Sequence, residues 1–312
     1  MSAAPRQGAA GTASVARATG DARLTVAVVN FRTPELALSC LTLVRRSAPG
    51  ADLRLVDADP DPDFAAALLG SHPDVDYLGV PNRSYAHAVN AGLAGATTEY
   101  VAFMNADVIV TDSTFAELLA ALDSRPQAVA AGPLVSGGDG KLQRLGPSYA
   151  RHYRRLRRSA PVGDGPATAD VPWLSGCLLV VRLRDWRGLG GYDEAFRFYN
   201  EDLDFGLRVS EAGRANLLVA TPVVHLGGTS TPSHPAFGLE GRRGGLLVGR
   251  RHYPGWLRAA QTAFVASEAA LGSVLGRTPG RRAASAELLR MLRAGDVDAT
   301  PFGATLDERP DW

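Results

Sequence analysis

The sequence has very little cysteine, which limits the kinds of structural site that it can build. Its 312 residues include two cysteines, Cys40 and Cys177, which lie far apart in the chain among apolar neighbours. Disulfide frameworks and structural zinc sites need several cysteines at characteristic spacings. Neither kind of site is therefore expected, and both thiols are predicted to be buried in a protein of a reducing compartment.

Neither sign of charge prevails in the chain. The 33 basic and 32 acidic side chains leave a formal net charge of +1. The molecule as a whole therefore has no electrostatic attraction for nucleic acid or for an anionic membrane. We predict that it has no nucleic-acid partner, and that any membrane contact comes from a local basic patch.

Long apolar runs are missing as well. A membrane-spanning helix needs about 20 consecutive apolar residues, and the best candidate, residues 259–276, contains Gln261 and Glu268. This run is more typical of a helix on a protein surface. Residues 1–23 have no apolar core of signal-peptide length and are rich in alanine, glycine, serine and threonine. We therefore expect a disordered N-terminal tail and a cytoplasmic protein.

Several common catalytic motifs are also absent. No G-x-G-x-x-G follows the first predicted strand, and the chain has neither a Walker A loop nor a G-x-S-x-G turn. These motifs bind dinucleotides, bind nucleotide phosphates and present a nucleophilic serine, respectively. Their absence disfavours dehydrogenase, ATPase and esterase activities.

From residue 24 onward the chain alternates between strand and helix patterns. Apolar runs rich in β-branched residues, typical of buried parallel strands, occupy residues 24–31, 53–59, 75–82 and 100–110. Runs typical of helices occupy residues 35–47, 64–71, 84–98 and 114–124. This alternation predicts a doubly wound, mostly parallel α/β sheet, in which ligands bind beyond the carboxyl ends of the strands. The polar residues at these ends are Asn30, Asp57, Asn82 and Asp107.

The later part of the chain is predicted to complete this domain and to add helices. Residues 136–170 are rich in glycine, proline and arginine, and we expect a long mobile segment there. Strands are expected within residues 171–183 and 216–228. The predicted organisation is a domain over residues 24–235, with a nucleotide-binding half (24–112) and an acceptor-binding and catalytic half (113–235), followed by a C-terminal helical extension (236–312).

Two predicted strand ends carry side chains suited to a metal ion. The triplet Asn105-Ala106-Asp107 interrupts one strand, and His225 ends another at the same expected rim of the sheet. Mg²⁺ and Mn²⁺ prefer carboxylate oxygens together with substrate phosphates, and imidazole is a further ligand for Mn²⁺. An Asx turn at Asp107 and a hydrogen-bonded core histidine at His225 are the alternative interpretations.

The stretch FYNEDLDFGLR, residues 198–208, sets three carboxylates among aromatic side chains. With Asn200 as the N-cap, Glu201 and Asp202 lie in the first helical turn, where the helix dipole stabilises each charge by about 0.3–1 kcal/mol. Asp204 can pair with the arginine four residues later. The flanking aromatic rings would also desolvate a carboxylate and raise its proton affinity, as a general base requires. A helix cap and a catalytic base are compatible interpretations.

Six segments occur in the order found in a known family. They are TVAVVNFRTPELALSCL, VPNRSYAHAVNAGL, YVAFMNADVIV, VPWLSGCLLVVR, GGYDEAFRFYNEDLDFGLRV and VVHLGGTS. Together they resemble glycosyltransferase family 2, in particular its bacterial rhamnosyltransferase branch, over residues 24–230. The resemblance implies a GT-A fold, a nucleotide-sugar donor, a divalent metal ion (Mn²⁺ or Mg²⁺) and inverting transfer by direct displacement.

The resemblance also implies roles for individual residues. Asp202 matches the catalytic base, with Glu201 as the acid beside it. Asp107 stands in the D-x-D-like metal motif, and His225 stands at the position that completes the metal shell. The positions that match the donor site are Asn30, Arg32, Asp57, Asn82, Arg83, Asn90, Asn105 and Asp107. Trp173 and Gly176 begin the acceptor-side motif, and Tyr199 belongs to the aromatic wall expected beside the acceptor.

These expectations describe an inverting, metal-dependent glycosyltransferase of the hexosyltransferase class. The first expectation for the donor is dTDP-rhamnose and the second is a UDP-hexose, and the acceptor is a hydroxyl of a glycan, a lipid-linked glycan or a small molecule. The segment RHYRRLRR, residues 151–158, is expected to contact a lipid pyrophosphate or the anionic inner face of the membrane, at about 1 kcal/mol per basic residue. A solvated helix face or a disordered lid is the alternative.

Two rival functions fit parts of the same pattern. A non-catalytic nucleotide-sugar-binding protein would keep the fold without turnover. A sugar-phosphate nucleotidyltransferase would also use an α/β sheet and acidic metal ligands, but it would need a glycine-rich triphosphate loop after the first strand. The residues found there, VVNFRTPE, contain no glycine.

Overall fold

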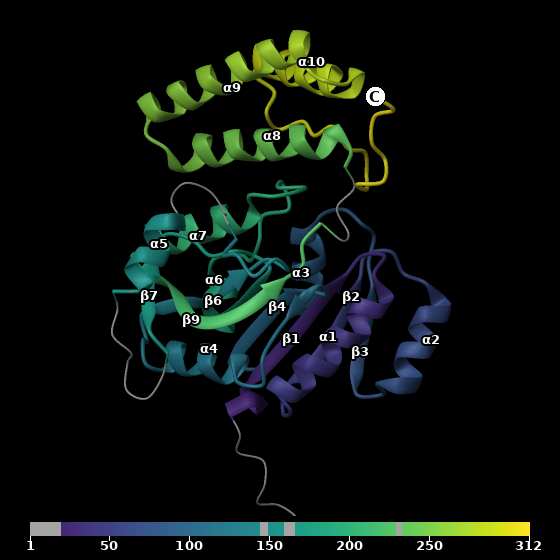
Figure 1. Cartoon of the computed structure of the whole chain (residues 1–312), viewed down its shortest axis with the longest axis vertical. Coiled ribbons are helices and arrows are strands. Elements are labelled where there is room, and N and C mark those ends of the chain that lie inside the picture. The colour runs from purple at the N-terminus through teal and green to yellow at the C-terminus, as the bar shows by residue number, and fades with distance from the viewer. Residues whose placement is uncertain (1–19, 144–148, 159–165, 229–232) are drawn as a thin grey trace, which may run out of the picture.

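The computed structural model describes residues 20–143, 149–158, 166–228 and 233–312. A central sheet carries helices on both faces, and a layer of three further helices lies beyond one edge of this sandwich (Figure 1). Residues 20–23, predicted to belong to a disordered tail, form the short 3-10 helix η1 (Gly20–Arg23), because Arg23 pairs with Glu99 and Asp123. The rest of the predicted tail lies outside the described residues.

The sheet confirms the predicted α/β class and has nine strands in the order β3-β2-β1-β4-β8-β6-β9-β5, with β7 beside β9. The strands are β1 (Leu24–Asn30), β2 (Asp52–Asp57), β3 (Val75–Gly79), β4 (Tyr100–Asn105), β5 (Val108–Ile109), β6 (Ala128–Ser136), β7 (Thr168–Val171), β8 (Leu178–Arg182) and β9 (Ala215–His225). The first four long strands pair in parallel, whereas β8 is antiparallel to both β4 and β6. The polar strand ends therefore meet at one rim.

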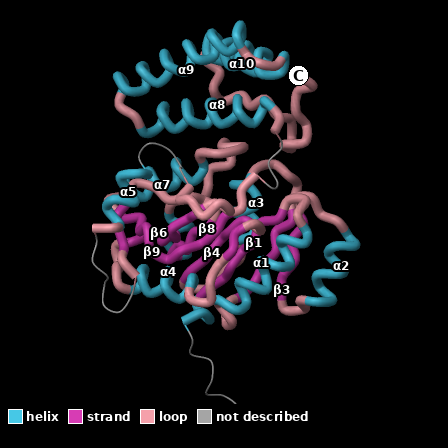
Figure 2. The backbone as a smooth tube through the Cα atoms, in the orientation of Figure 1, coloured by secondary structure: helices cyan, strands magenta, loops and turns pink. Residues whose placement is uncertain are grey.

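The helices bury the sheet on both faces (Figure 2). They are α1 (Pro34–Ser47), α2 (Pro62–Ser71), α3 (Tyr85–Leu93), α4 (Thr114–Asp123), α5 (Tyr149–Leu156), α6 (Leu183–Gly188) and α7 (Glu201–Glu211). Side chains of β1 alternate between two core clusters, because successive residues of a strand point to opposite faces. Val26 and Val28 pack with α1 and α4, whereas Ala27 and Val29 pack with α3, α6 and α7. Every residue of β1 is buried, as a strand covered on both faces requires.

The segment 136–170 is more regular than the sequence pattern predicts. It contains the end of β6, the helix α5 and the start of β7, while residues 144–148 and 159–165 lie outside the described part of the chain. In α5, Tyr153 and Leu156 are buried against the sheet domain, and the arginines lie on the exposed side. The sequence pattern also missed β6, whose run AVAAGPLVS has few large β-branched residues.

The C-terminal layer consists of α8 (Pro235–His252), α9 (Gly255–Leu275) and α10 (Pro279–Ala294), so helices are present where the sequence predicted them. The chain then leaves α10 through Gly295, whose φ of 69° lies in the left-handed region that favours glycine. Within the described residues, none of the helices is both long enough and apolar enough to cross a membrane.

Candidate active site

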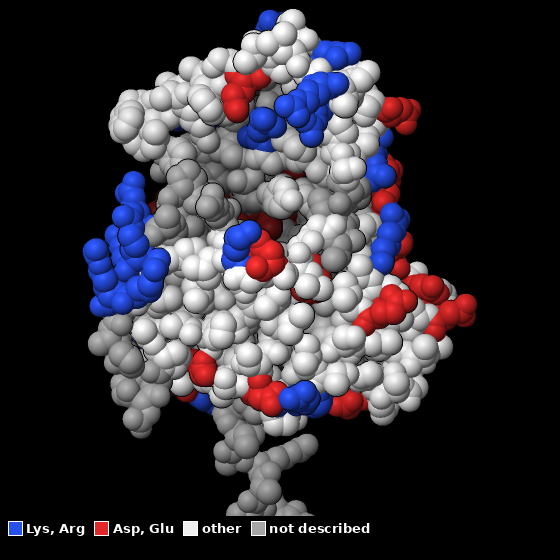
Figure 3. Space-filling view, viewed as in Figure 1, with Lys and Arg blue, Asp and Glu red and all other residues white. Residues whose placement is uncertain are grey.

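A cleft of about 400 Å³ lies at the rim where β1, β4 and β9 end. Its lining includes eight of the residues that the sequence singled out: Asn82, Asn105, Asp107, Gly176, Tyr199, Glu201, Asp202 and His225. Figure 3 shows a hollow on this face between the sheet domain and the C-terminal layer, with acidic side chains inside it. Segments distant in sequence therefore converge on one space.

The strand ends of β4 and β9 bring Asp107 and His225 together. Asp107 Oδ1 lies 3.3 Å from His225 Nε2, and Asp107 Oδ2 accepts a hydrogen bond from the Gly227 backbone N–H at 3.0 Å. The contact follows from the pairing of β5 with β9, which sets Val108 opposite His225. Both side chains are mostly shielded from solvent, so the pair is held in a fixed orientation at the cleft wall.

His225 is surrounded by further polar groups. Its Nε2 lies 3.2 Å from Asn105 Nδ2, and its Nδ1 lies 3.1 Å from Gln143 Nε2. Burial lowers the pKa of His225, but its hydrogen bonds with Asp107 and Cys177 outweigh that effect and raise the pKa to about 10. A histidine must lose its proton to bind a metal ion, so metal binding here would release a proton.

The residues around Asp107 fit a divalent cation. Asn105 Oδ1 is buried and has no hydrogen-bond partner, although it lies beside this pair. A buried oxygen without a partner is costly unless something else satisfies it. Within the described residues no group of three or more His, Cys, Asp or Glu side chains forms a metal cluster. The available donors are therefore one carboxylate, one imidazole and one amide oxygen, a set that leaves room for donor phosphates.

Asp202 lies in the first turn of α7 and faces the loop that precedes β8. Its Oδ2 accepts a hydrogen bond from the Gly176 N–H at 2.9 Å, and its Oδ1 accepts one from the Leu203 N–H at 2.8 Å. A side chain at Gly176 would place its Cβ 3.2 Å from Asp202 Cβ and 3.1 Å from the Tyr192 hydroxyl. A larger residue at position 176 would therefore be a tight fit, and Asp202 and Tyr192 would have to shift by a few tenths of an ångström. Burial raises the pKa of Asp202, although the hydrogen bonds from Gly176 and Leu203 oppose the shift.

Glu201 lines the same cleft, but its carboxylate has a different hydrogen-bonding environment from that of Asp202. Its Oε2 is buried without a hydrogen-bond partner. Burial, followed by the nearby charge of Asp202, raises the pKa of Glu201 well above the ordinary glutamate value. The two neighbouring acids thus have different environments, and Glu201 is the one that favours its neutral form.

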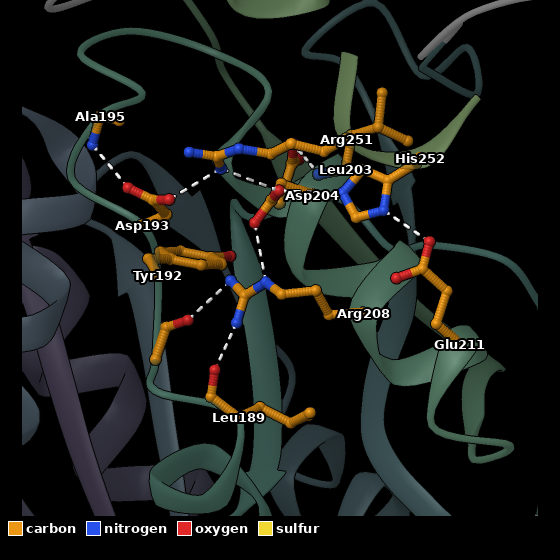
Figure 4. A network of polar contacts seen from close by, with 12 residues as sticks. Leu189, Tyr192, Asp193, Ala195, Leu203, Asp204, Arg208, Glu211, Arg251 and His252 are labelled. Carbon is orange, nitrogen blue, oxygen red and sulfur yellow. Dashed lines mark hydrogen bonds and ion pairs between the residues drawn. The ribbon is translucent and has the colours of Figure 1, made fainter. Parts of the chain in front are cut away.

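Asp204, the third acid of this stretch, serves the structure rather than the cleft. Its predicted pairing with Arg208 is confirmed at 2.8 Å, and its other oxygen lies 3.2 Å from Arg251 and 3.0 Å from His252 of α8 (Figure 4). Arg208 also donates to the carbonyl oxygens of Leu189 and Gly191. This network joins α7, which carries the candidate base, to the C-terminal layer.

The expected capping role of Asn200 differs in the structure. Asn200 precedes α7 in a left-handed conformation and makes no capping hydrogen bond; its side-chain N–H donates to the Gly241 carbonyl oxygen of α8 at 3.0 Å. Tyr199 and Asn200 have φ values of 65° and 74°, in the left-handed region that non-glycine residues seldom adopt. Such strain persists only where surrounding contacts hold it, and here α8 supplies them.

Three of the expected donor residues lie at one edge of the cleft but outside its lining. Asp57 is fully buried and accepts hydrogen bonds from Asn30 at 3.0 Å and from the Tyr77 hydroxyl at 2.9 Å. Arg32 pairs with Asp59 at 2.7 Å. These contacts satisfy both Asp57 oxygens within the protein, so its contact with the donor stays a prediction.

Three other expected residues also lie outside the lining. The Asn90 side-chain amide donates to the Tyr192 carbonyl oxygen at 2.8 Å and accepts from the Tyr192 N–H at 3.1 Å, and so fixes the turn that precedes residues 198–208. The Arg83 carbonyl oxygen accepts a hydrogen bond from Arg197, and its side chain is exposed. Trp173 packs against Gly206 of α7, where an added Cβ would lie 2.5 Å from Trp173 Cβ. Their contact with substrates stays a prediction.

The cleft also contains residues that sequence reasoning missed. Tyr85 donates from its hydroxyl to the Gly176 carbonyl oxygen at 2.8 Å, and Gln143 lies against His225. Leu306, Asp307 and Arg309 come from the far end of the chain. Tyr85 belongs to the segment VPNRSYAHAVNAGL, so the family resemblance could have identified it. No local sequence pattern connects residues 306–309 with the strand ends.

Comparison with known proteins agrees with this architecture. Residues 25–171 match the model of the family described as Glycosyl transferase family 2. The chain carries a family 2 glycosyltransferase domain. A curated relative, the N-acetylglucosaminyl-diphospho-decaprenol L-rhamnosyltransferase of Mycobacterium tuberculosis, is 29% identical over 270 residues, which are 75% of this chain and 86% of the relative.

Solved structures of glycosyltransferases share the fold of this glycosyltransferase. The mannosyltransferase PcManGT from Pyrobaculum calidifontis, in complex with GDP-Man and Mn²⁺, aligns with a TM-score of 0.54 and 18% identity, covering 88% of this chain and 87% of that one. GalNAc-T7 with UDP, GalNAc and Mn²⁺ aligns with a TM-score of 0.58 and 14% identity, covering 87% of this chain and 56% of that one. The predicted GT-A class and the resemblance to family 2 are thus confirmed.

Proposed function

We propose that this family 2 glycosyltransferase is an inverting, metal-dependent enzyme that transfers a sugar from a nucleotide diphosphate to an acceptor hydroxyl. The observation that carries the proposal is the convergence on one cleft of the Asp202 carboxylate and the pair formed by Asp107 and His225. A base and a metal-ligand pair around one space suit displacement of a pyrophosphate leaving group. No covalent nucleophile is required.

Asp202 is the proposed base of this reaction. The N–H groups of Gly176 and Leu203 hold its carboxylate, and a free lone pair takes the proton of the acceptor hydroxyl. The acceptor oxygen bonds to the anomeric carbon as the bond from that carbon to the nucleoside diphosphate breaks, so the anomeric configuration inverts. The raised pKa of Glu201 favours its neutral form. The Asp202 carboxylate therefore has no second negative charge directly beside it.

Asp107, His225 and Asn105 are the residues that would hold a Mn²⁺ or Mg²⁺ ion. When bound, such an ion neutralises the negative charge that develops on the departing diphosphate. The aromatic side chains of Phe198, Tyr199 and Phe237 line the cleft. The ring centroids of Phe198 and Phe237 lie 4.6 Å apart, so α8 helps to build this wall.

The first proposed donor is dTDP-rhamnose and the second is a UDP-hexose. The name of the mycobacterial relative, an L-rhamnosyltransferase acting on a decaprenol-linked substrate, supports rhamnose and a lipid-linked glycan acceptor. A bound ligand raises the apparent stability of a folded protein. Thermal shifts with a series of nucleotide sugars, each with and without Mn²⁺ or Mg²⁺, are therefore expected to be largest for the true donor with metal present.

The metal proposal predicts that Asp107→Ala removes the metal-dependent part of this thermal shift and abolishes transfer. Asp112→Ala is the matched control, because Asp112 is an exposed acid nearby in the chain. Unchanged donor binding and transfer in Asp107→Ala, or full activity of the wild type in chelator, would refute the metal role. Donor binding without any transfer in the wild type would favour the non-catalytic alternative.

We further propose a cytoplasmic enzyme that contacts the anionic inner face of the membrane. The exposed arginines of residues 151–158 gather over α5 at one edge of the face shown in Figure 3. Helix α9 adds an exposed apolar stripe, with Trp256, Phe264, Leu271 and Val274 between 62% and 73% exposed. A basic cluster together with an exposed apolar helix face is typical of interfacial binding to anionic lipid.

Sedimentation with phosphatidylglycerol vesicles tests the membrane contact. Replacing Arg151, Arg157 and Arg158 with glutamine is expected to weaken binding by about 1 kcal/mol for each arginine. Phe264→Ser should weaken it further. The control replaces three exposed arginines elsewhere, Arg46, Arg184 and Arg290. Equal binding by all variants, or a dimer in solution that Phe264→Ser dissociates, would contradict membrane docking.

A further inference from the structure

Residues 296–312, the return segment, connect the end of the C-terminal layer to the donor side of the cleft. After Gly295 the chain runs back past α8, where Thr300 donates to Glu240 at 3.1 Å. Phe302 and Leu306 are buried in a cluster with Phe237 of α8. The segment is therefore packed against the protein on its way to the cleft.

The return segment then contacts the loops that follow β1 and β3. The Leu306 N–H donates to the Asn82 carbonyl oxygen at 2.7 Å, and the Asn82 amide donates to Asp307 Oδ2 at 3.1 Å. The other Asp307 oxygen lies 3.3 Å from Arg32 Nη2. Asp307 therefore joins two residues that the sequence assigned to the donor site, across most of the length of the chain.

Two groups hold the return segment in this position. Arg197 donates to the carbonyl oxygens of Gly303 and Ala304 at 3.1 and 3.2 Å. Arg243 forms a fully buried pair with Glu240 and donates to the Val297 carbonyl oxygen at 3.0 Å. The segment is thus tied both to α8 and to the stretch that leads to Glu201 and Asp202.

The charges around the cleft single out Arg309. The lining contains four carboxylates, from Asp107, Glu201, Asp202 and Asp307, and Arg309 is its one arginine or lysine among the described residues. Within those residues the Arg309 side chain has no hydrogen bond or ion pair, whereas Asp307 has two partners. A nucleotide-sugar diphosphate is anionic, and guanidinium groups bind phosphate oxygens through paired hydrogen bonds.

We propose that the return segment is the wall of the donor site and that Arg309 binds the donor diphosphate. Asp307 is a positioning residue, which holds Asn82 in the lining of the cleft and also pairs with Arg32 outside that lining. This inference rests on the proposed use of a nucleotide-sugar donor. It adds to the strand-end residues a cation supplied by the opposite end of the chain.

Titration of the full chain with dTDP and UDP, in the presence of Mn²⁺, tests the role of Arg309. Loss of a charge-assisted contact is expected to weaken diphosphate binding about tenfold or more in Arg309→Ala. Arg309→Lys should retain part of that affinity, and the nucleosides thymidine and uridine should bind both variants as they bind the wild type. Arg293→Ala is the control, since Arg293 is exposed on α10. Asp307→Asn should weaken nucleosides and diphosphates alike.

Hydrogen exchange provides a second measurement that does not depend on a substitution. Binding of dTDP or UDP with Mn²⁺ should slow exchange in residues 303–309 and leave α10 unchanged. Wild-type affinity in Arg309→Ala, equal weakening of nucleosides and diphosphates in that variant, or unchanged exchange in residues 303–309 would overturn the inference. If the wild type binds no nucleotide or nucleotide sugar at all, the proposed function fails with it.

Discussion

The sheet domain and the C-terminal layer are held together by different means. The sheet domain buries two large apolar clusters, one on each face of the sheet. The C-terminal layer has smaller apolar clusters and also contains buried ion pairs and hydrogen bonds. Among these, the ion pair of Glu240 and Arg243 is the most buried. The sheet thus places the strand ends that line the cleft, whereas the C-terminal layer positions the segments that line its other side.

One group of contacts between the two regions lies around the candidate base. Arg251 and His252 of α8 reach Asp204 of α7, two residues after Asp202 (Figure 4). Asn200 bonds to α8, and Arg197 receives the return segment. The sheet places Asp107 and His225 by strand pairing, but Asp202 depends on both regions. Substitutions in the two regions should therefore have separable effects.

The largest expected effect is on the chemistry at the rim. Asp202→Asn should lower the rate of sugar transfer about 10²- to 10⁴-fold, because general base catalysis contributes a factor of that size. Donor binding and thermal stability should stay close to those of the wild type, as measured by calorimetric titration and thermal unfolding. Glu211→Gln, at the other end of α7, is the control, and transfer at the wild-type rate in Asp202→Asn would show that Asp202 is not the base.

The next largest effect is expected from the buried ion pair between Glu240 and Arg243 in the C-terminal layer. Glu240→Gln should lower the free energy of unfolding by about 3–5 kcal/mol, because it leaves the buried Arg243 without a counter-charge. Glu287→Gln is a matched control with the same i,i+3 spacing to Arg290, but that pair lies at the solvent-exposed surface, so its loss should lower the free energy of unfolding far less. Denaturant unfolding measures both, and similar losses in the two variants would contradict the importance of burial.

The smallest expected effect is a change in stability with pH at Glu201. Burial raises the pKa of Glu201 in the folded state, so the folded protein binds this proton more tightly than the unfolded chain does. Stability should therefore fall as the pH rises from the ordinary glutamate range toward the raised pKa of about 8. Glu201→Gln should flatten this part of the curve of melting temperature against pH, and an unchanged slope would contradict the assignment.

Much of the fold and part of the site could be predicted from local sequence. The alternation of apolar runs identified the parallel strands, and polar residues at strand ends marked the cleft. Asp107, His225 and Asp202 lie where this reasoning placed them, because strand ends and helix starts are local features. Gly176 was identified by its motif, and the close approach of Asp202 and Tyr192 provides its physical reason.

Other features escaped because they depend on contacts between distant segments. Asn90 belongs to a family motif, but its side-chain amide forms hydrogen bonds with the Tyr192 backbone. Tyr192 lies about a hundred positions later in the chain, so only the tertiary packing brings it close to Asn90 on α3. Asp57 ends a strand as predicted, yet Asn30 and Tyr77 occupy its carboxylate. A sequence pattern identifies a polar residue at the rim without showing which neighbour its side chain contacts.

The sequence by itself determined the α/β class, the position of the rim and three of the acids that line it, Asp107, Glu201 and Asp202, because these follow from short apolar and polar patterns. Only the tertiary structure decided that α8 contacts α7, which carries the candidate base, and that the return segment completes the cleft. Asn82 and Asp307 are separated by 225 positions, and their hydrogen bond depends on the packing of everything between them. No local pattern encodes such a contact, since its energy is realised only after both regions have folded.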